Sequence, residues 1–258
     1  MTEVRIERDA RGVATLWLSR AEKHNALSAA MMGEIEAACA ALAGDETVRV
    51  VVLAAEGKSF CAGGDLAWMQ AQFDMDGATR RTESRRIASA LQALAGLPQP
   101  LIGRVQGNAL GGGVGLISVC DVTVGVETAK LGFTEVRLGL IPANIGPFVV
   151  AKMGARAARE VFMNGRIFGA TEAVRLGLLT RCVAPEALDA ALEAEIAPYL
   201  SCAPQAVREA KALLNALAGQ VTPEQVDMAI DALAARWETD EARSGISAFF
   251  DKRPAPWA

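Results

Sequence analysis

Residues 107–121, GNALGGGVGLISVCD, carry three consecutive glycines at 111–113, a fourth at Gly115, and then an apolar run. The preceding segment, LIGRVQG at 101–107, is typical of a buried strand. Amides at the start of a helix lack partners within the helix and carry partial positive charge, and glycine lets another group approach them closely. The stretch therefore predicts a turn between a strand and a helix, with backbone amides open to a ligand.

A second loop, FCAGGD at 60–65, has the same layout. It follows the continuous apolar run VRVVVLAAE and precedes DLAWMQAQF, which predicts a helix with Asp65 as its N-cap. Glycines in such places also serve tight turns or close helix packing, so either loop alone leaves both interpretations open. Together, the two loops can direct two N–H groups at one oxygen, which favours an oxyanion hole for a carbonyl that gains charge during a reaction.

Strand-like and helix-like segments alternate through the first two-thirds of the chain. Residues 13–19 and 122–126 predict strands, and residues 28–44 and 85–97 predict helices. After about Gly154 the pattern is helical to the end. This arrangement predicts an α/β body followed by a helical C-terminal portion.

Composition restricts the classes of protein that fit. The chain has 258 residues, 52% hydrophobic and 22% charged, which suffices for a large domain with a substantial core. Its net charge of −4 argues against a nucleic-acid binder. Residues 1–9 lack the apolar segment of a signal peptide, and the longest uncharged run, 105–120, is too short to span a membrane. We therefore expect a cytoplasmic protein without membrane or nucleic-acid partners.

Several common site chemistries are not indicated. The five cysteines are widely spaced, so we expect reduced thiols and neither a disulfide framework nor a zinc site. His24 is the only histidine, which excludes a multi-histidine metal site and leaves a Ser-His-Asp triad dependent on one loop residue. No Gly-Lys-Ser/Thr follows the glycines, and the dinucleotide pattern G-x-G-x-x-G fails at Leu116.

Glu135 is the carboxylate that stands out. It lies in the mostly apolar segment AKLGFTEVRLGLIPANIG, residues 129–146. A carboxylate held among apolar side chains has a raised pKa and can act as an acid or base near neutral pH. The alternative is a surface glutamate paired with Arg137, and spacing alone does not separate the two.

Taken together, these motifs resemble the signatures of the enoyl-CoA hydratase/isomerase (crotonase) superfamily. SFCAGGDLAWM resembles its A-G-x-D loop, and VQGNALGGGVGLISVCD with AKLGFTEVRLGLIP resembles its main signature. RAEKHNALS, at 20–28, is similar to its N-terminal CoA-contacting loop. The segments FMNGRIFGATEAVRLGLLTRCVAP and APQAVREAKALL match its C-terminal pattern, so the resemblance covers almost the whole chain.

The resemblance implies a crotonase-like α/β fold, with a spiral core of ββα units at 1–195 and a helical trimerisation region at 196–258. It implies homotrimers or dimers of trimers. It implies an acyl-CoA thioester as substrate, with coenzyme A as part of the substrate and no metal or other cofactor. Glu135 would be catalytic, and the amides of Gly64 and Gly112 would form the oxyanion hole.

The same resemblance implies further contacts with the substrate. The residues expected near coenzyme A are Lys23, Ala26, Ala62, Asp65 and Leu66. For Asp65, a helix cap is an equally good interpretation. Trp68 and Met69 could line the acyl pocket, although an apolar pair on a helix more often belongs to a core. Phe249, Phe250 and Lys252 could contact coenzyme A across a subunit interface, or simply pack in a terminal helix.

The chain departs from the family pattern at two places. Typical hydratases of the family carry two catalytic glutamates, and Gly115 stands where the first is expected. The usual P-G-x-G-G is replaced by IPANIGP at 141–147. This combination resembles bacterial methylglutaconyl-CoA hydratases, whose substrate would carry a distal carboxylate bound by an arginine or lysine.

Three functions remain open from the sequence. The first is hydration of a 2-enoyl-CoA, with 3-methylglutaconyl-CoA or a related branched or dicarboxylic thioester expected as substrate. The second is isomerisation of a 3-enoyl-CoA to a 2-enoyl-CoA, which suits Glu135 as a single base. The third is non-catalytic binding of acyl-CoA.

Overall fold

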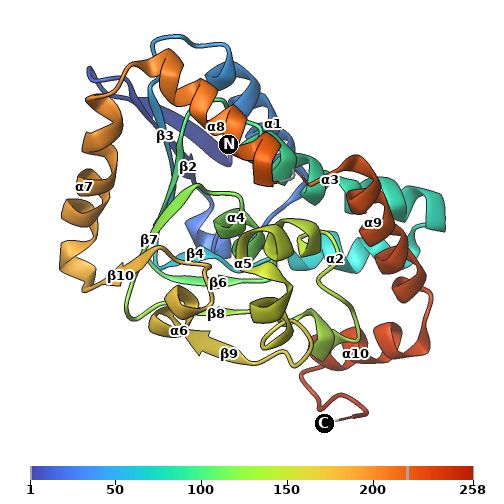
Figure 1. Ribbon diagram of the computed structural model, residues 1–258. Helices are drawn as coiled ribbons and strands as arrows, with labels where there is room; N and C mark the ends of the chain where they lie inside the picture. Colours follow the sequence, from blue (N-terminus) through green and yellow to red (C-terminus); the bar gives the residue numbers. More distant parts are fainter. Residues whose placement is uncertain (1, 219–220, 258) are drawn as a thin grey trace.

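Two β-sheets form the body of the protein in the computed structural model, which describes residues 2–218 and 221–257 (Figure 1). All neighbouring strands within them run parallel except the pairs β1–β2 and β8–β9. The larger sheet consists, in order, of β1 (Val4–Arg8), β2 (Val13–Leu18), β3 (Val50–Ala55), β5 (Leu101–Val105), β7 (Val122–Val126) and β10 (Arg181–Val183). The smaller consists of β4 (Ser59–Cys61), β6 (Asn108–Leu110), β8 (Lys130–Gly132) and β9 (Ile167–Gly169).

Helices connect and cover these strands. They are α1 (Ala29–Ala43), α2 (Leu66–Ala71), α3 (Gly77–Ala95), α4 (Gly112–Ser118), α5 (Gly146–Arg159), α6 (Ala170–Arg175), α7 (Leu188–Leu200), α8 (Pro204–Ala218), α9 (Pro223–Trp237) and α10 (Asp240–Phe250). Short 3-10 turns are η1 (Ala21–Lys23), η2 (Gln72–Asp74), η3 (Glu135–Leu138) and η4 (Pro185–Ala187). Within the described residues, no helix combines the length and apolar composition needed to cross a bilayer.

The chain advances through the sheets as a spiral. Strands β3, β5 and β7 are each followed by one short strand of the smaller sheet and then by helix. Strands β3, β5 and β7 come from successive turns and pair in parallel, as do β4, β6 and β8, which requires such crossover connections. Strand β3 is buried along its whole length, as expected for a central parallel strand. The expected spiral of ββα units is confirmed.

Local capping signals explain where the helices begin. The hydroxyl of Ser28 accepts a hydrogen bond from the amide of Met31 at 3.0 Å and so caps α1, as its sequence predicts. Thr222 and Gln225 form a capping box at the start of α9.

Three details differ from the sequence-based expectation. The two glycine loops contain short strands, β4 and β6, because their backbones pair with each other. Helix α5 begins at Gly146, before the expected start near Gly154, where a φ of 74° breaks the helical geometry. Residues 222–250, whose sequence is helical in pattern throughout, form two helices, because Thr239 caps a new helix, α10.

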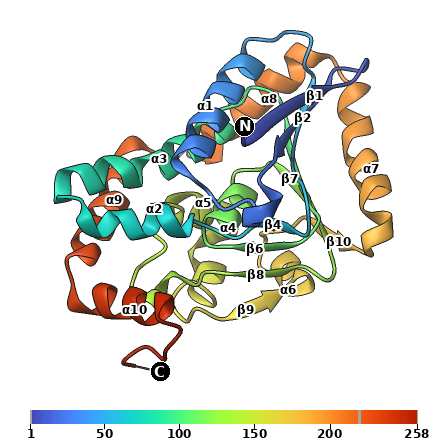
Figure 2. The ribbon, with the colours of Figure 1, turned by 180° about the vertical axis from the view of Figure 1, so that it is seen from behind.

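The last two helices fold back onto the body of the same chain. Helix α9 packs along α3 (Figure 2). Helix α10 packs against η3. Leu233 and Trp237 of α9 join Ala242 and Ile246 of α10 in an apolar cluster with Leu140 that is separate from the main core. The C-terminal helical region is therefore present as expected, and the division at 195/196 stays a prediction.

Candidate active site

The two glycine loops lie directly against each other. Strand β4 pairs with β6, so the turns that follow them are neighbours. A Cβ atom added to Gly113 would lie 2.4 Å from the carbonyl oxygen of Cys61, and one added to Gly63 would lie 3.7 Å from the amide nitrogen of Gly112. Glycine is required at 113 because the two backbones leave no room for a side chain.

Two amides in these turns are free to bind a ligand. A parallel bridge to Leu27 uses the carbonyl of Gly63 and the amide of Asp65, which leaves the N–H of Gly64 between them unused. Gly112 is the first residue of α4, where a helix leaves its amides without internal partners. Neither amide donates to another group in the part of the chain that the structure describes. Both residues line one cavity.

Glu135 brings its carboxylate to the same place. It begins η3, just after β8, and a Cβ built on Gly111 would lie 3.0 Å from its Oε1 and 3.9 Å from its Oε2. The residue as a whole is half-buried, but Oε2 is fully enclosed and has no hydrogen-bond partner. Desolvation raises the pKa of Glu135 to about 7, against a smaller opposing effect of a hydrogen bond from its own backbone. Glu135 is therefore not the surface partner of Arg137.

The cavity has a volume of about 430 Å³ and is mostly apolar. It brings together the expected residues Gly64, Gly112, Glu135, Ala62, Leu66, Trp68 and Met69. Its remaining walls come from the loop after η3 and from the C-terminal helices, including Leu140, Ile141, Leu233, Trp237 and Phe249. Lys23, Ala26 and Asp65 do not line it.

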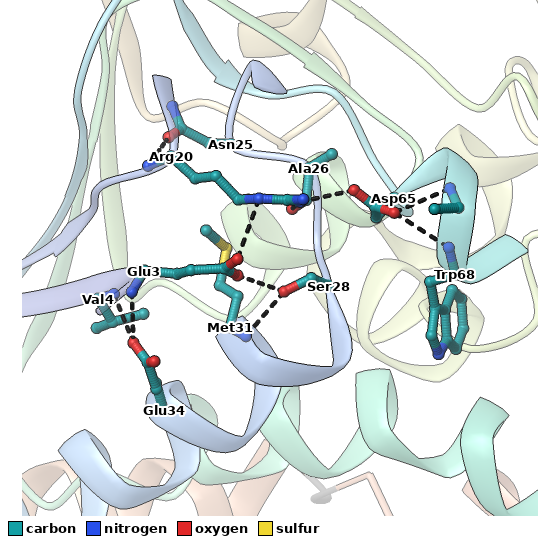
Figure 3. Close-up of polar contacts among 11 residues, drawn as sticks. Glu3, Val4, Arg20, Asn25, Ala26, Ser28, Met31, Glu34, Asp65 and Trp68 are labelled. Carbon is teal, nitrogen blue, oxygen red and sulfur yellow. Dashed lines mark hydrogen bonds and ion pairs between the residues drawn. The ribbon is translucent and has the colours of Figure 1, made fainter. Parts of the chain in front are cut away.

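Asp65 joins the loop at 62–66 to the loop at 20–28, the two segments expected near coenzyme A (Figure 3). Its Oδ1 accepts hydrogen bonds from the amides of Ala67 and Trp68, which caps α2, and its Oδ2 pairs with Arg20 at 2.6 Å. Burial opposes ionisation of Asp65, but the bonds from Trp68 and Arg20 outweigh it and lower its pKa. The helix-cap interpretation of Asp65 is confirmed.

Arg20 extends this network to the N-terminal loop (Figure 3). It also donates to the carbonyl of Ala26 at 3.1 Å and pairs with Glu3 at 3.1 Å. Lys23 and Ala62 are exposed, and the amide of Ala62 donates to the carbonyl of His24 at 3.0 Å. The loops at 20–28 and 62–66 are thus joined side by side, and their contact with coenzyme A stays a prediction.

The space above Gly115 is filled by apolar side chains. A Cβ atom at this position would lie 2.5 Å from Cγ2 of Ile145 and 3.2 Å from Cδ1 of Leu91. Every residue of α4 is buried. With Ile145 and Leu91 in these positions, a second carboxylate has no room to project from residue 115.

Two cavity residues were missed in the sequence. Arg137 and Asn144 both line the cavity, and neither stood out as more than a loop residue. The replacement of P-G-x-G-G by IPANIGP marked this loop as unusual, but Asn144 occupies the variable position of that pattern, so the sequence did not single it out. Nothing in the sequence indicated that Leu233 and Trp237 close the cavity.

Comparison with known proteins shows which family the chain resembles. The family model described as Enoyl-CoA hydratase/isomerase matches residues 8–258. A protein of Thermus thermophilus carries the provisional name enoyl-CoA hydratase. It is 36% identical to this chain, and the match covers 94% of this chain and 96% of the Thermus protein. The mitochondrial methylglutaconyl-CoA hydratase of Mus musculus is 30% identical, over 96% of this chain and 80% of its own. The crystal structure of an enoyl-CoA hydratase from Mycobacterium avium has a TM-score of 0.88 at 31% identity and covers 100% of both chains.

Proposed function

The chain belongs to the enoyl-CoA hydratase/isomerase family, and from this premise we propose that it is a lyase that hydrates 2-enoyl-CoA thioesters. The observation that carries the proposal is the position of the Glu135 carboxylate. Its Oε2 is enclosed and unpaired, and the carboxylate lies beside Gly111, which precedes the free amide of Gly112. An acid–base group and an oxyanion hole in one apolar cavity are the two elements that this reaction needs.

The reaction can run through one carboxylate. The oxygen of a water molecule adds to C3 while Glu135 takes one proton from that water. The negative charge moves to the thioester oxygen, where the amides of Gly64 and Gly112 stabilise it. Protonated Glu135 then gives the proton to C2, so that water has been added across the double bond. A pKa of about 7 suits both steps, because Glu135 must gain and lose a proton in each cycle. This acid–base chemistry requires no metal or redox cofactor.

An absorbance assay tests this function. Hydration removes the conjugated double bond, so the absorbance of crotonyl-CoA and 3-methylglutaconyl-CoA should fall when the protein is added. A 3-hydroxyacyl-CoA should accumulate in step with that fall. Absence of hydration across a panel of 2-enoyl-CoA thioesters would refute the proposal.

Isomerisation is the second candidate, favoured by the filled space above Gly115. A single base can remove a proton from C2 and return it at C4, without water. A 3-enoyl-CoA would then gain conjugated absorbance, with no 3-hydroxy product. Supplying both substrate classes to the same preparation separates the two functions.

For the acyl group, we propose a branched dicarboxylic chain such as that of 3-methylglutaconyl-CoA. The support is Arg137, the only cation among the described residues that line the cavity. Arg137 forms no ion pair with Glu135, and Arg137 is exposed. An unpaired guanidinium is well suited to a carboxylate, which it can bind through two hydrogen bonds.

Replacing Arg137 by alanine should raise KM for 3-methylglutaconyl-CoA by roughly 10- to 100-fold, since a charge-assisted hydrogen bond contributes about 1.5–3 kcal/mol. KM for crotonyl-CoA, which has no distal carboxylate, should change less than about threefold, and Michaelis–Menten kinetics with both substrates measures the difference. Arg156→Ala, on α5 outside the cavity lining, is the matched control. An equal rise with both substrates would instead assign Arg137 to the coenzyme A moiety.

We also propose that copies of the chain assemble as trimers, or dimers of trimers, through their C-terminal region. The support is an apolar stripe on α8, where Leu213, Leu214 and Leu217 are 60%, 66% and 76% exposed. Exposed apolar stripes of this kind commonly mark protein interfaces.

The double variant Leu214→Glu with Leu217→Glu should dissociate to monomers, because it places two charges in the contact. Size-exclusion chromatography with light scattering measures the mass, and Glu209→Lys on an exposed part of α8 serves as control. A monomeric unmodified protein at about 10 µM would contradict the proposal.

A further inference from the structure

Two residues that line the same cavity each carry a buried side-chain oxygen without a hydrogen-bond partner. Of the buried, unpartnered side-chain atoms in residues 2–218 and 221–257, only Oε2 of Glu135 and Oδ1 of Asn144 belong to cavity-lining residues. Native proteins satisfy almost all buried polar atoms, because leaving an acceptor unpaired is costly. Two orphaned acceptors in one cavity therefore point to a ligand that supplies two donors.

Asn144 is the sequence neighbour of the residue that blocks a second carboxylate. It precedes Ile145, whose side chain fills the space above Gly115. It follows η3, which begins with Glu135, by a short loop. The chain thus places an amide next to the position from which a second carboxylate is excluded.

We propose that Asn144 binds the reacting water together with Glu135. A water molecule has two O–H donors, and the two orphaned oxygens are acceptors, so each receives one hydrogen bond. This leaves a lone pair of the water oxygen for C3 of the substrate. An amide cannot take up a proton, so the water proton passes to Glu135 and from there to C2. The proposal rests on the proposed hydratase function.

Other polar groups of the cavity fit this task less well. Ser84 and Thr134 also line it, but neither contributes a buried oxygen without a partner. A hydroxyl can also turn its own proton toward a neighbouring acceptor, whereas Oδ1 of an amide can only accept. Asn164, an exposed asparagine outside the cavity lining, provides the matched control.

The test separates water addition from proton transfer at C2. Asn144→Ala should lower kcat for hydration by roughly 10- to 100-fold, as expected for one lost hydrogen bond to the reacting group. KM should stay within about twofold. Exchange of the C2 protons of butyryl-CoA with deuterated solvent needs Glu135 and the oxyanion hole but no water addition, so its rate should not change. Nuclear magnetic resonance measures this exchange.

Two further variants complete the design. Asn144→Thr retains an acceptor oxygen and should recover part of the hydration rate, while Asn144→Leu has similar volume and no acceptor and should behave like alanine. Asn164→Ala should keep hydration within about threefold. If Asn144→Ala does not fold, the comparison of threonine with leucine decides the question.

Two outcomes would overturn the role of Asn144. In the first, hydration by the alanine and leucine variants stays within about threefold of the unmodified protein. In the second, hydration and C2 exchange fall in parallel, which indicates a general structural effect. An unmodified protein that exchanges C2 protons but hydrates nothing would instead refute the hydratase function itself, and the role of Asn144 with it.

Discussion

The variant Glu135→Gln is expected to hydrate 2-enoyl-CoA roughly 10³- to 10⁴-fold more slowly than the unmodified protein. Glutamine keeps the shape of the side chain but can neither take the proton of water nor deliver one to C2. Among the described residues that line the cavity, no other carboxylate is present to compensate. Initial rates with crotonyl-CoA measure the loss.

The pH dependence of the unmodified enzyme provides a second measure of the same group. Glu135 must be ionised to accept the water proton, so kcat/KM should rise with pH through about 7. In Glu135→Gln this rise should disappear. A profile that rises instead near the ordinary glutamate pKa of about 4.3 would contradict the enclosed position of the carboxylate.

Loss of activity should be accompanied by a gain in stability. Burial raises the pKa of folded Glu135 from 4.5 to about 7, which corresponds to a free-energy cost of about 3 kcal/mol once the group is ionised in the folded state. That cost is absent below the unfolded pKa and is complete above the folded pKa. Glu135→Gln should therefore raise Tm by several degrees at about pH 8.5 and by much less at about pH 5. Glu186→Gln, an exposed substitution of the same kind, should change neither Tm nor rate.

The second large effect is expected from the substitution of Gly115, and it concerns the stability of the folded protein. Gly115→Glu, which would restore the family's usual pair of glutamates, should lower the free energy of unfolding by roughly 3 kcal/mol or more. Its Cβ would lie 2.5 Å from Ile145, and its charge would enter a helix whose every residue is buried. Thermal unfolding should show a fall in Tm of about 6–12 °C, or the variant should accumulate as insoluble protein.

Gly33→Glu is the matched control. Gly33 is an exposed residue of α1, and a Cβ atom there meets nothing within 4 Å. Since glutamate is a better helix former than glycine, this variant should be as stable as the unmodified protein or slightly more so. Adding Ile145→Ala to Gly115→Glu removes the 2.5 Å contact and should restore part of the lost stability. If Gly115→Glu unfolds at the unmodified Tm, Ile145 does not block this position.

Local signals in the sequence account for much of the fold. The buried run at 48–56 and the caps at Ser28 and Asp65 identified elements because each depends on neighbouring residues alone. The paired glycine loops and Glu135 were recognisable for a related reason, since bare backbone and an isolated carboxylate are unusual in apolar segments. The structure brings these groups into one cavity, and their roles in catalysis stay predictions for the experiments above.

What the sequence did not indicate depends on contacts between distant segments. The three-residue strands β4, β6 and β8 are too short to show alternation and exist only because they pair with one another. Ile145 blocks the space above Gly115 across 30 positions of sequence, and no periodicity reveals such a contact. The burial of the amide oxygen of Asn144 likewise depends on the packing of distant segments, so the sequence shows only a loop residue.

The separate apolar cluster of the C-terminal helices has a consequence for how such enzymes diversify. The groups proposed to do the chemistry belong to the spiral, whereas Leu233, Trp237 and Phe249 enclose the far side of the cavity from α9 and α10. Substitutions in these helices can change the shape of the cavity while the turns around Gly64 and Gly112 keep their backbone contacts. The C-terminal helices therefore offer positions at which the shape of the cavity can be altered without changing Glu135 or the two glycine turns.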